Sequence, residues 1–134
     1  MLTDPAFAIR AKDLFNHTET PTTNDIDLLK IGRHFRFDKD TKLVVGRNKD
    51  ENEIIKALAL DEDILLEAKD HVGPISLIRG KNAQDHVENG AAITLRYSDA
   101  PKDTPSVVTV QKNVTTSEVL AVPAIEPAYL QYRI

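Results

Sequence analysis

The sequence predicts a single domain of the α+β (mixed α/β) class, with interleaved strands, about three helices, and strands at the C-terminus. Three observations predict it. Segments with helix caps and apolar stripes alternate with short apolar runs of strand length over the first 97 residues. The remaining residues carry only strand-like runs. Finally, 134 residues, 41% hydrophobic and 28% charged, suit one compact core.

The first helix is expected from Asp4-Pro5 to about His17, because proline favours the first turn of a helix. Its apolar side would be formed by Phe7, Ile9, Leu14 and Phe15. The polar stretch NHTETPTTND then predicts a linker. Residues 26–37 predict a short element and a strand that ends at the turn DKDT.

A strand over residues 42–47 is followed at once by a helix signal. Asn48 is a favourable N-cap, and Glu51 three residues later predicts a reciprocal capping box. The helix should end near Leu60, with one apolar stripe made by Ile54, Ile55, Leu58 and Ala59.

DILLEAK and PISLIRG predict two more strands, separated by a turn at Gly73-Pro74. A third helix is expected from about Ala83 to Tyr97. Gly90 inside it predicts close backbone packing, because glycine there costs about 1 kcal/mol relative to alanine. After a proline-bearing loop, VVTVQK, EVLAVP and YLQYRI predict three final strands.

Positive charge is concentrated in one segment. Between Lys30 and Lys49 there are seven basic and two acidic residues, whereas the rest of the chain has ten basic and nineteen acidic. Such asymmetry indicates either one face that meets an anionic partner on an acidic body, or a solvated hairpin rich in lysine and arginine.

Arginine and aromatic side chains interleave at residues 33–37, a combination that suits RNA because guanidinium groups pair with phosphate and flat rings stack on unpaired bases. In a strand, Arg33, Phe35 and Phe37 share one face. The phenylalanines are then expected in the core, which leaves His34 and Arg36 facing solvent.

The sequence lacks the residues that metal sites and common catalytic motifs require. The sequence has no cysteine, its four histidines do not have zinc-site spacing, and neither a phosphate-binding glycine loop nor a G-x-S-x-G motif occurs. We therefore expect no catalytic residue, metal or cofactor in this chain. No apolar run approaches the ~18 residues that cross a bilayer, so a cytoplasmic protein without membrane association is expected.

Four segments, in order, resemble the NFACT-type RNA-binding domain: VVGRNKDENEII, EAKDHVGPISLI, AAITLRYSDA and VVTV. LTDPAFAIRAKDL and LLKIGRHFRF resemble the version of that domain at the C-terminus of thiouridylase-like tRNA-modification proteins. The chain departs from better-known NFACT domains at Leu65, Leu66 and Glu67, where they carry an aromatic and a histidine. The matching positions are Gly32, Arg33, His34, Arg36, Gly46, Arg47, Asn48, Asn52, Gly73, Pro74, Ala91, Ala92, Tyr97 and Ser98.

The resemblance implies that residues 1–134 form one non-catalytic domain that binds structured RNA, with tRNA expected. It also implies that the chain is the C-terminal part of a longer protein. The ATP-using catalytic domain, of the adenine nucleotide alpha hydrolase kind, would precede it. Together with the charge pattern, it predicts the RNA contacts Arg33, His34, Arg36, Arg47 and Lys49.

Two alternatives stay open at this point. The basic segment and the apolar C-terminal strands could belong to a docking or oligomerisation domain of such an enzyme. An independent small hydrolase is the other alternative, although the sequence contains no recognisable nucleophile or metal constellation.

Overall fold

The computed structural model describes residues 4–126 and 128–134, and it confirms the α+β class. Its helices and strands, in chain order, are α1 (Pro5–His17), α2 (Thr23–Leu29), β1 (Arg33–Asp38), β2 (Thr41–Val45), α3 (Lys49–Leu58), β3 (Ile64–Ala68), β4 (Ile75–Gly80), α4 (Val87–Arg96), β5 (Ser106–Lys112) and β6 (Thr115–Ala121). Short 3-10 helices cover Ala83–His86 (η1) and Leu130–Tyr132 (η2).

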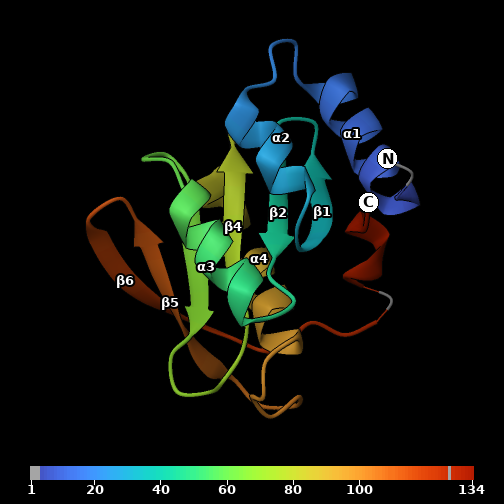
Figure 1. The fold of residues 1–134 in the computed structure, drawn as a ribbon. Coiled ribbons are helices and arrows are strands. Elements are labelled where there is room, and N and C mark those ends of the chain that lie inside the picture. Colours follow the sequence, from blue (N-terminus) through green and yellow to red (C-terminus); the bar gives the residue numbers. More distant parts are fainter. Residues whose placement is uncertain (1–3, 127) are drawn as a thin grey trace.

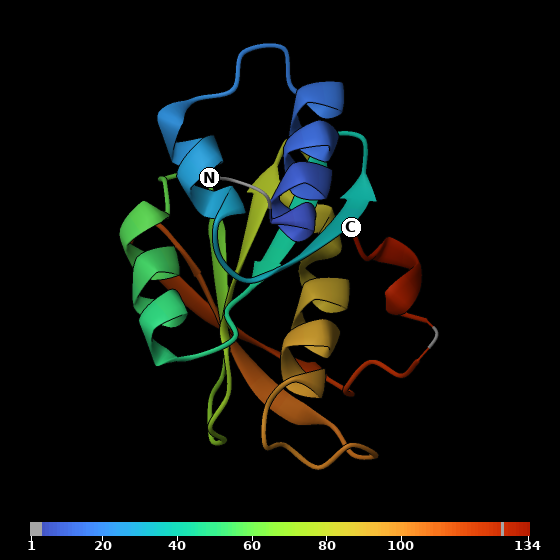
Figure 2. The ribbon, with the colours of Figure 1, turned by 45° about the vertical axis from the view of Figure 1, so that its right-hand side comes forward.

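The six strands form one sheet in the order β1-β2-β4-β3-β5-β6, and every neighbouring pair is antiparallel. Helices α2 and α3 lie on one face and α4 on the other, so the sheet is the middle of three layers (Figure 1). Figure 2 shows α1 beside α2, over the β1 end of the sheet. On the α3 side, none of the helices formed by the described residues covers the β5–β6 end (Figure 1).

Helix α4 packs closely on the sheet, as the glycine within it predicts. A Cβ on Gly90 would come within 2.9 Å of side-chain carbons of Ile78 and Leu66. Ala91, Ile93 and Leu95 of the same helix are fully buried in this core. The close approach of α4 therefore requires a residue without a side chain at position 90.

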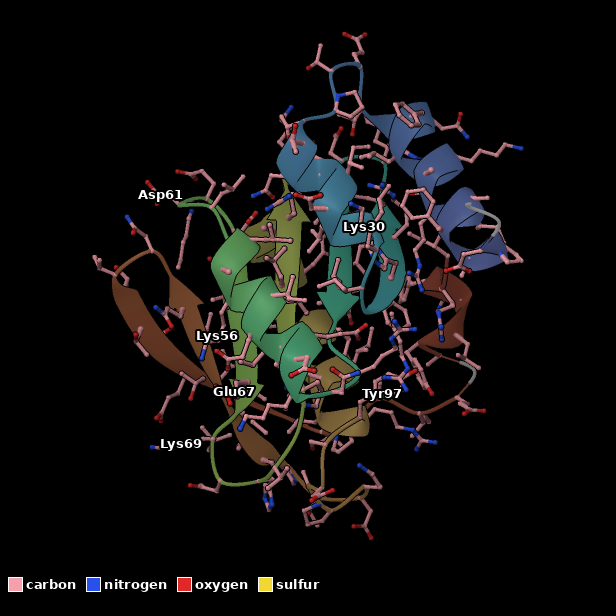
Figure 3. All side chains as sticks on the ribbon, in the orientation of Figure 1. Lys30, Lys56, Asp61, Glu67, Lys69 and Tyr97 are labelled. Carbon is pink, nitrogen blue, oxygen red and sulfur yellow. The ribbon has the colours of Figure 1, made fainter. Side chains whose placement is uncertain are left out.

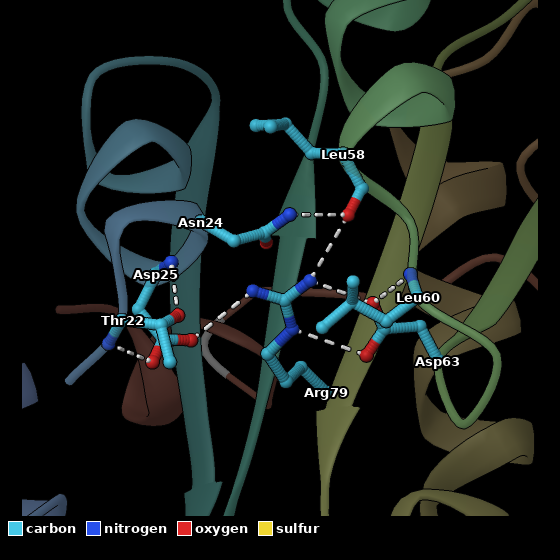
Figure 4. Close-up of polar contacts among 7 residues, drawn as sticks. All are labelled: Thr22, Asn24, Asp25, Leu58, Leu60, Asp63 and Arg79. Carbon is cyan, nitrogen blue, oxygen red and sulfur yellow. Dashed lines mark hydrogen bonds and ion pairs between the residues drawn. The ribbon is translucent and has the colours of Figure 1, made fainter. Parts of the chain in front are cut away.

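On the other face, Arg79 of β4 joins the helices to the sheet (Figure 4). Its guanidinium donates to Asp63 at 3.1 and 2.7 Å, to Asp25 of α2 at 3.1 Å, and to the carbonyl oxygen of Leu58 in α3 at 3.3 Å. Asn24 of α2 donates to the same carbonyl at 3.0 Å. Arg79 therefore holds α2, α3 and the start of β3 in one arrangement.

Several expectations about individual segments are wrong. The expected strand YLQYRI contains η2 instead, with a single bridge between Arg133 and Phe35. The expected helix from Ala83 to Tyr97 is divided into η1 and α4. Three residues placed on apolar stripes point to solvent, because those helices bury only one narrow side: Ile9 (56% exposed), Phe15 (60%) and Ile54 (42%).

Three cations lie opposite one another across neighbouring strands, where like charges repel. Arg36 of β1 faces Lys42 of β2, and Lys42 faces Arg79 of β4. Burial, followed by repulsion from Arg36, lowers the pKa of Lys42 to about 8 from its usual 10.5. The ammonium of Lys42 is thus a source of instability at neutral pH.

We predict that Arg79→Met lowers the free energy of unfolding by about 3–5 kcal/mol, because it leaves two largely buried carboxylates without their cation. Lys56→Met is the control: its pair with Glu53 is exposed, and losing it should cost less than about 1 kcal/mol. Urea unfolding at pH 7 measures both, and equal losses would contradict the role given to Arg79.

We predict that Lys42→Met raises the free energy of unfolding by about 2–3 kcal/mol at pH 7, because a pKa depressed on folding favours the unfolded, protonated state. The stability of the wild type should rise as pH increases from about 8 to 10.5, where only its unfolded chain still binds the proton. The gain from Lys42→Met should therefore shrink by pH 10. Urea unfolding at pH 7 and 10 measures it, and a pH-independent gain would contradict the prediction.

Candidate nucleic-acid interface

A cleft of about 490 Å³ opens where β2 ends and α3 begins. It is lined by residues from four segments that are far apart in the sequence. These are Arg33, Gly46, Arg47, Asn48, Lys49, Asn52, Val72, Gly73, Pro74, Tyr97 and Asp99. Eight of these are positions that match the NFACT-type motifs, so the motif residues gather at one place in the fold.

Glu51 of α3 organises one wall of the cleft. Its Oε1 accepts hydrogen bonds from the backbone N–H of Gly32 at 3.1 Å and of Arg47 at 2.9 Å. Both carboxylate oxygens also accept from the Arg47 guanidinium, at 2.9 and 2.6 Å. Asn48 caps α3 by accepting a hydrogen bond from the Glu51 N–H at 2.9 Å, as predicted. The second hydrogen bond of the predicted capping box, from the Asn48 N–H to the Glu51 carboxylate, is wrong. That carboxylate is directed to Gly32 and Arg47 instead.

Asn52 and two glycines bring the other walls together. The Asn52 side chain accepts from the Ile75 N–H at 3.0 Å, and a Cβ on Gly46 would collide with its Oδ1. A Cβ on Gly73 would lie 2.5 Å from the Cβ of Ser98. Glycine at position 46 therefore leaves room for the Asn52 side chain that binds Ile75, and glycine at position 73 lets the 72–74 loop closely approach Ser98, which follows α4.

Three cations converge on the cleft. The Arg33 guanidinium lies 4.4 Å from the centre of the Tyr97 ring, a cation–π contact. Arg47 is exposed while paired with Glu51, and Lys49 is exposed. In the described part of the chain, neither Arg33 nor Lys49 forms an ion pair. Asp99 is the one carboxylate in the lining.

Further arginines lie close to this group. The pKa of Arg10 is lowered by burial and then by repulsion from Arg47 and Arg133, partly offset by attraction to Asp4 and Glu51. Arg133 lies 5.5 Å from the centre of the Phe35 ring. Figure 3 shows Tyr97 near the start of α3, on the side of the molecule that faces α1 and the C-terminal segment. Arg10 and Arg133, from opposite ends of the chain, thus add positive charge near Arg47, although neither lines the cleft.

The expectation that His34 faces solvent is wrong. The residue is fully buried, and its Nε2–H donates to the Ile31 carbonyl at 2.8 Å. Burial, followed by repulsion from Lys42, lowers the pKa of His34 well below 6.5, which makes the ring neutral. The alternation along β1 is as predicted, but helices cover the face on which His34 lies.

Arg36 lies on the same covered face and is likewise not solvent-facing. Its guanidinium donates to Asp13 of α1 at 3.1 and 2.5 Å, and only 16% of its side chain is exposed. Of the other basic residues in 30–49, Lys42 is buried, while Lys30 and Lys39 form exposed pairs with Asp27 and Asp40. The segment is therefore not one positive strip, and only Arg33, Arg47 and Lys49 of the five expected contacts come together.

Within residues 4–126 and 128–134, no group of three or more histidine, aspartate or glutamate side chains is arranged to hold a metal ion. None of the helices in these residues is long and apolar enough to span a bilayer.

Comparison with known protein families shows to which family this chain belongs. The family model described as the NFACT protein RNA-binding domain matches residues 32–132, about three quarters of the chain. The chain belongs to the NFACT RNA-binding domain family. A search of curated proteins finds no match to this NFACT domain.

One solved structure similar to this NFACT domain is the C-terminal part of the fibronectin/fibrinogen-binding protein from Streptococcus suis. The TM-score is 0.64 at 18% identity, over 78% of this chain and 50% of that one. The NFACT domain described here thus spans half the length of that structure. At this identity the likeness concerns the fold.

Residue-level reasoning missed part of the cleft. Tyr97 and Asn52 were among the motif positions, but nothing in their local sequence indicated that they lie beside Arg33 and Arg47. The local sequence indicates only a capping role for Glu51. No sequence pattern indicates that Arg10 and Arg133 lie near residue 47, because only folding brings the two ends of the chain there.

We predict that Glu51→Gln destabilises the domain by about 2–3 kcal/mol at pH 7. The hydrogen bond from Arg47, opposed by burial and aided by the backbone N–H donors, lowers the pKa of Glu51 to about 2 from 4.5. A depressed carboxyl pKa stabilises the fold above pH 4.5, and this stabilisation is lost as pH falls towards 2. The difference between wild type and Glu51→Gln should therefore fall by about half by pH 3.

Urea unfolding at pH 7 and 3 measures this difference. Glu53→Gln, on the same helix but 61% exposed, is the control and should change stability by less than about 1 kcal/mol. A Glu51→Gln effect no larger than that of the control would contradict the organising role of Glu51.

Proposed function

We propose that this NFACT domain is a non-catalytic module that binds tRNA at the cleft and presents it to a catalytic domain in the same polypeptide. That domain would be thiouridylase-like, of the adenine nucleotide alpha hydrolase kind, and would use ATP. Family membership supports RNA as the partner class. The choice of tRNA and of the parent enzyme rests on the resemblance of the N-terminal segments to those of tRNA-modification proteins.

The observation that carries the proposal is the convergence of Arg33, Arg47 and Lys49 around Tyr97 in a cleft lined by motif positions. Guanidinium and ammonium groups position a nucleic acid through its phosphates, whatever its sequence. Arg33 has no carboxylate partner in the described residues and is held in place by the Tyr97 ring, so its donors can face a phosphate. Tyr97 and Pro74, which both line the cleft, supply apolar side chains against which an unpaired base can pack.

The cleft also has donors that are not cations. The Oδ1 atoms of Asn48 and Asn52 accept hydrogen bonds from backbone N–H groups. These bonds fix the orientation of each carboxamide and leave its NH₂ group available to donate to a ligand. Recognition would therefore combine phosphate contacts at the rim with amide contacts inside the cleft.

We predict that Arg33→Ala with Lys49→Ala weakens tRNA binding about tenfold or more near 0.1 M salt and lowers the slope of log K against log salt by about 2, because each lost phosphate contact removes about 1. Filter binding of the chain to bulk tRNA at several salt concentrations measures both. The matched control is Lys30→Ala with Lys39→Ala. It removes the same charge from the same segment but at exposed, already paired side chains.

If both double variants weaken binding equally, the effect is one of net charge and the cleft is refuted as the RNA site. The docking alternative makes a different prediction, since it requires association without RNA. Light scattering on the purified chain separates the two: an oligomer whose mass is insensitive to Arg33→Ala with Lys49→Ala, together with no tRNA binding, would favour docking.

A further inference from the structure

Beneath α1 and α2 lies a row of positive charge that the cleft does not use. Arg36, Lys42 and Arg79 are direct cross-strand partners on β1, β2 and β4, and their side chains share the face that α1 and α2 cover. Like charges in such positions repel, so a protein that keeps them there must compensate them.

The compensation is complete at one end of the row and incomplete at the other. Arg79 pairs with two carboxylates, those of Asp25 and Asp63. Arg36 pairs with one, Asp13 of α1. The Nζ of Lys42 is buried at 5% residue exposure and has no hydrogen-bond acceptor among the described residues. Two cations at the β1–β2 end thus share one carboxylate, which is supplied by α1.

Helix α1 is held less firmly than its neighbour. Leu14 is the one large apolar side chain of α1 that is buried, and Ile9 and Phe15 are exposed. Its polar attachments are the Asp13–Arg36 pair and a hydrogen bond from Arg10 to the Leu29 carbonyl at 3.0 Å. By contrast, α2 buries Leu28 and Leu29 completely and is fastened by Arg79.

The covered cations Arg36 and Lys42 lie on β1 and β2, the strands that also lead to the cleft. Arg33 and Arg36 are three residues apart on the edge strand β1 and point to its opposite faces, and Arg47 follows β2 five residues after Lys42. The family match begins at residue 32, so α1 lies outside the part of the chain that defines the domain. Figures 1 and 2 both place α1 against α2 and β1, as an outer element at the edge of the molecule.

We propose that Arg36 and Lys42 form a second contact surface for the phosphate backbone of RNA, and that α1 is a cover which leaves this surface when RNA binds. A phosphate then takes the place of the Asp13 carboxylate beside Arg36 and supplies the acceptor that Lys42 lacks. These contacts offset the modest packing lost with α1. The proposal rests on the proposed function, because the RNA held in the cleft is the same molecule that reaches the covered surface.

Hydrogen exchange of the wild-type chain with and without tRNA tests the cover directly. Amides of α1, residues 6–17, should exchange at least several-fold faster in the complex, while those of α2, residues 23–29, should not. Unchanged or slower exchange of α1 would overturn the proposal. This measurement needs no variant and therefore does not depend on the folding of one.

Affinity tests the second surface. Asp13→Asn removes the carboxylate that holds α1 on Arg36, and we expect it to tighten tRNA binding about three- to tenfold at 0.1 M salt. Asp27→Asn is the matched control, since it makes the same change of charge at an exposed pair with Lys30. Adding Arg36→Ala and Lys42→Ala to Asp13→Asn should abolish the gain. Equal effects of Asp13→Asn and Asp27→Asn would refute the covered surface.

The two proposals fail in distinguishable ways. If tRNA binding is weakened by Arg33→Ala with Lys49→Ala, but α1 exchange and the Asp13→Asn affinity do not change, the cleft stands and the covered surface is refuted. If neither the wild type nor Asp13→Asn binds tRNA, both proposals are refuted.

Discussion

The arrangement of this domain depends on one constraint, that consecutive side chains of β1 point to opposite faces of a sheet covered on both sides there. Arg33 falls on the face of α4 and reaches Tyr97 at the mouth of the cleft. His34 and Arg36 fall on the face of α1 and α2, where helices exclude solvent. One basic segment is therefore divided between a candidate ligand site and the interior.

Charges placed in the interior need partners from other elements. Arg79 obtains two carboxylates and fastens two helices to the sheet, which makes a buried cation part of the framework. Lys42 obtains none among the residues described, and the lowered pKa of its ammonium reflects that burial. The same row of cations thus contains Arg79, which stabilises the fold through its ion pairs, and Lys42, whose charge has no partner among the described residues.

The cleft is built on α3 through two side chains that face inward. Glu51 receives N–H groups from Gly32 and Arg47, so it sets the distance between the start of β1 and the β2–α3 turn. Asn52 binds the start of β4 and packs where glycine at position 46 leaves room. The exposed cations are positioned by this buried polar scaffold, which suits a site that must hold a charged ligand without rearrangement.

The sequence alone determined the α+β class, the helices and strands up to residue 121 apart from α2, the Asn48 cap and the family, because caps, periodicity and motifs are local properties of the chain. Tertiary structure decided which charges are accessible. No local pattern could show that α1 and α2 cover His34 and Arg36, that Glu51 bonds Gly32 rather than Asn48, or that Tyr97 lies under Arg33. Exposure and charge pairing are set by segments distant in sequence, and only packing brings those segments together.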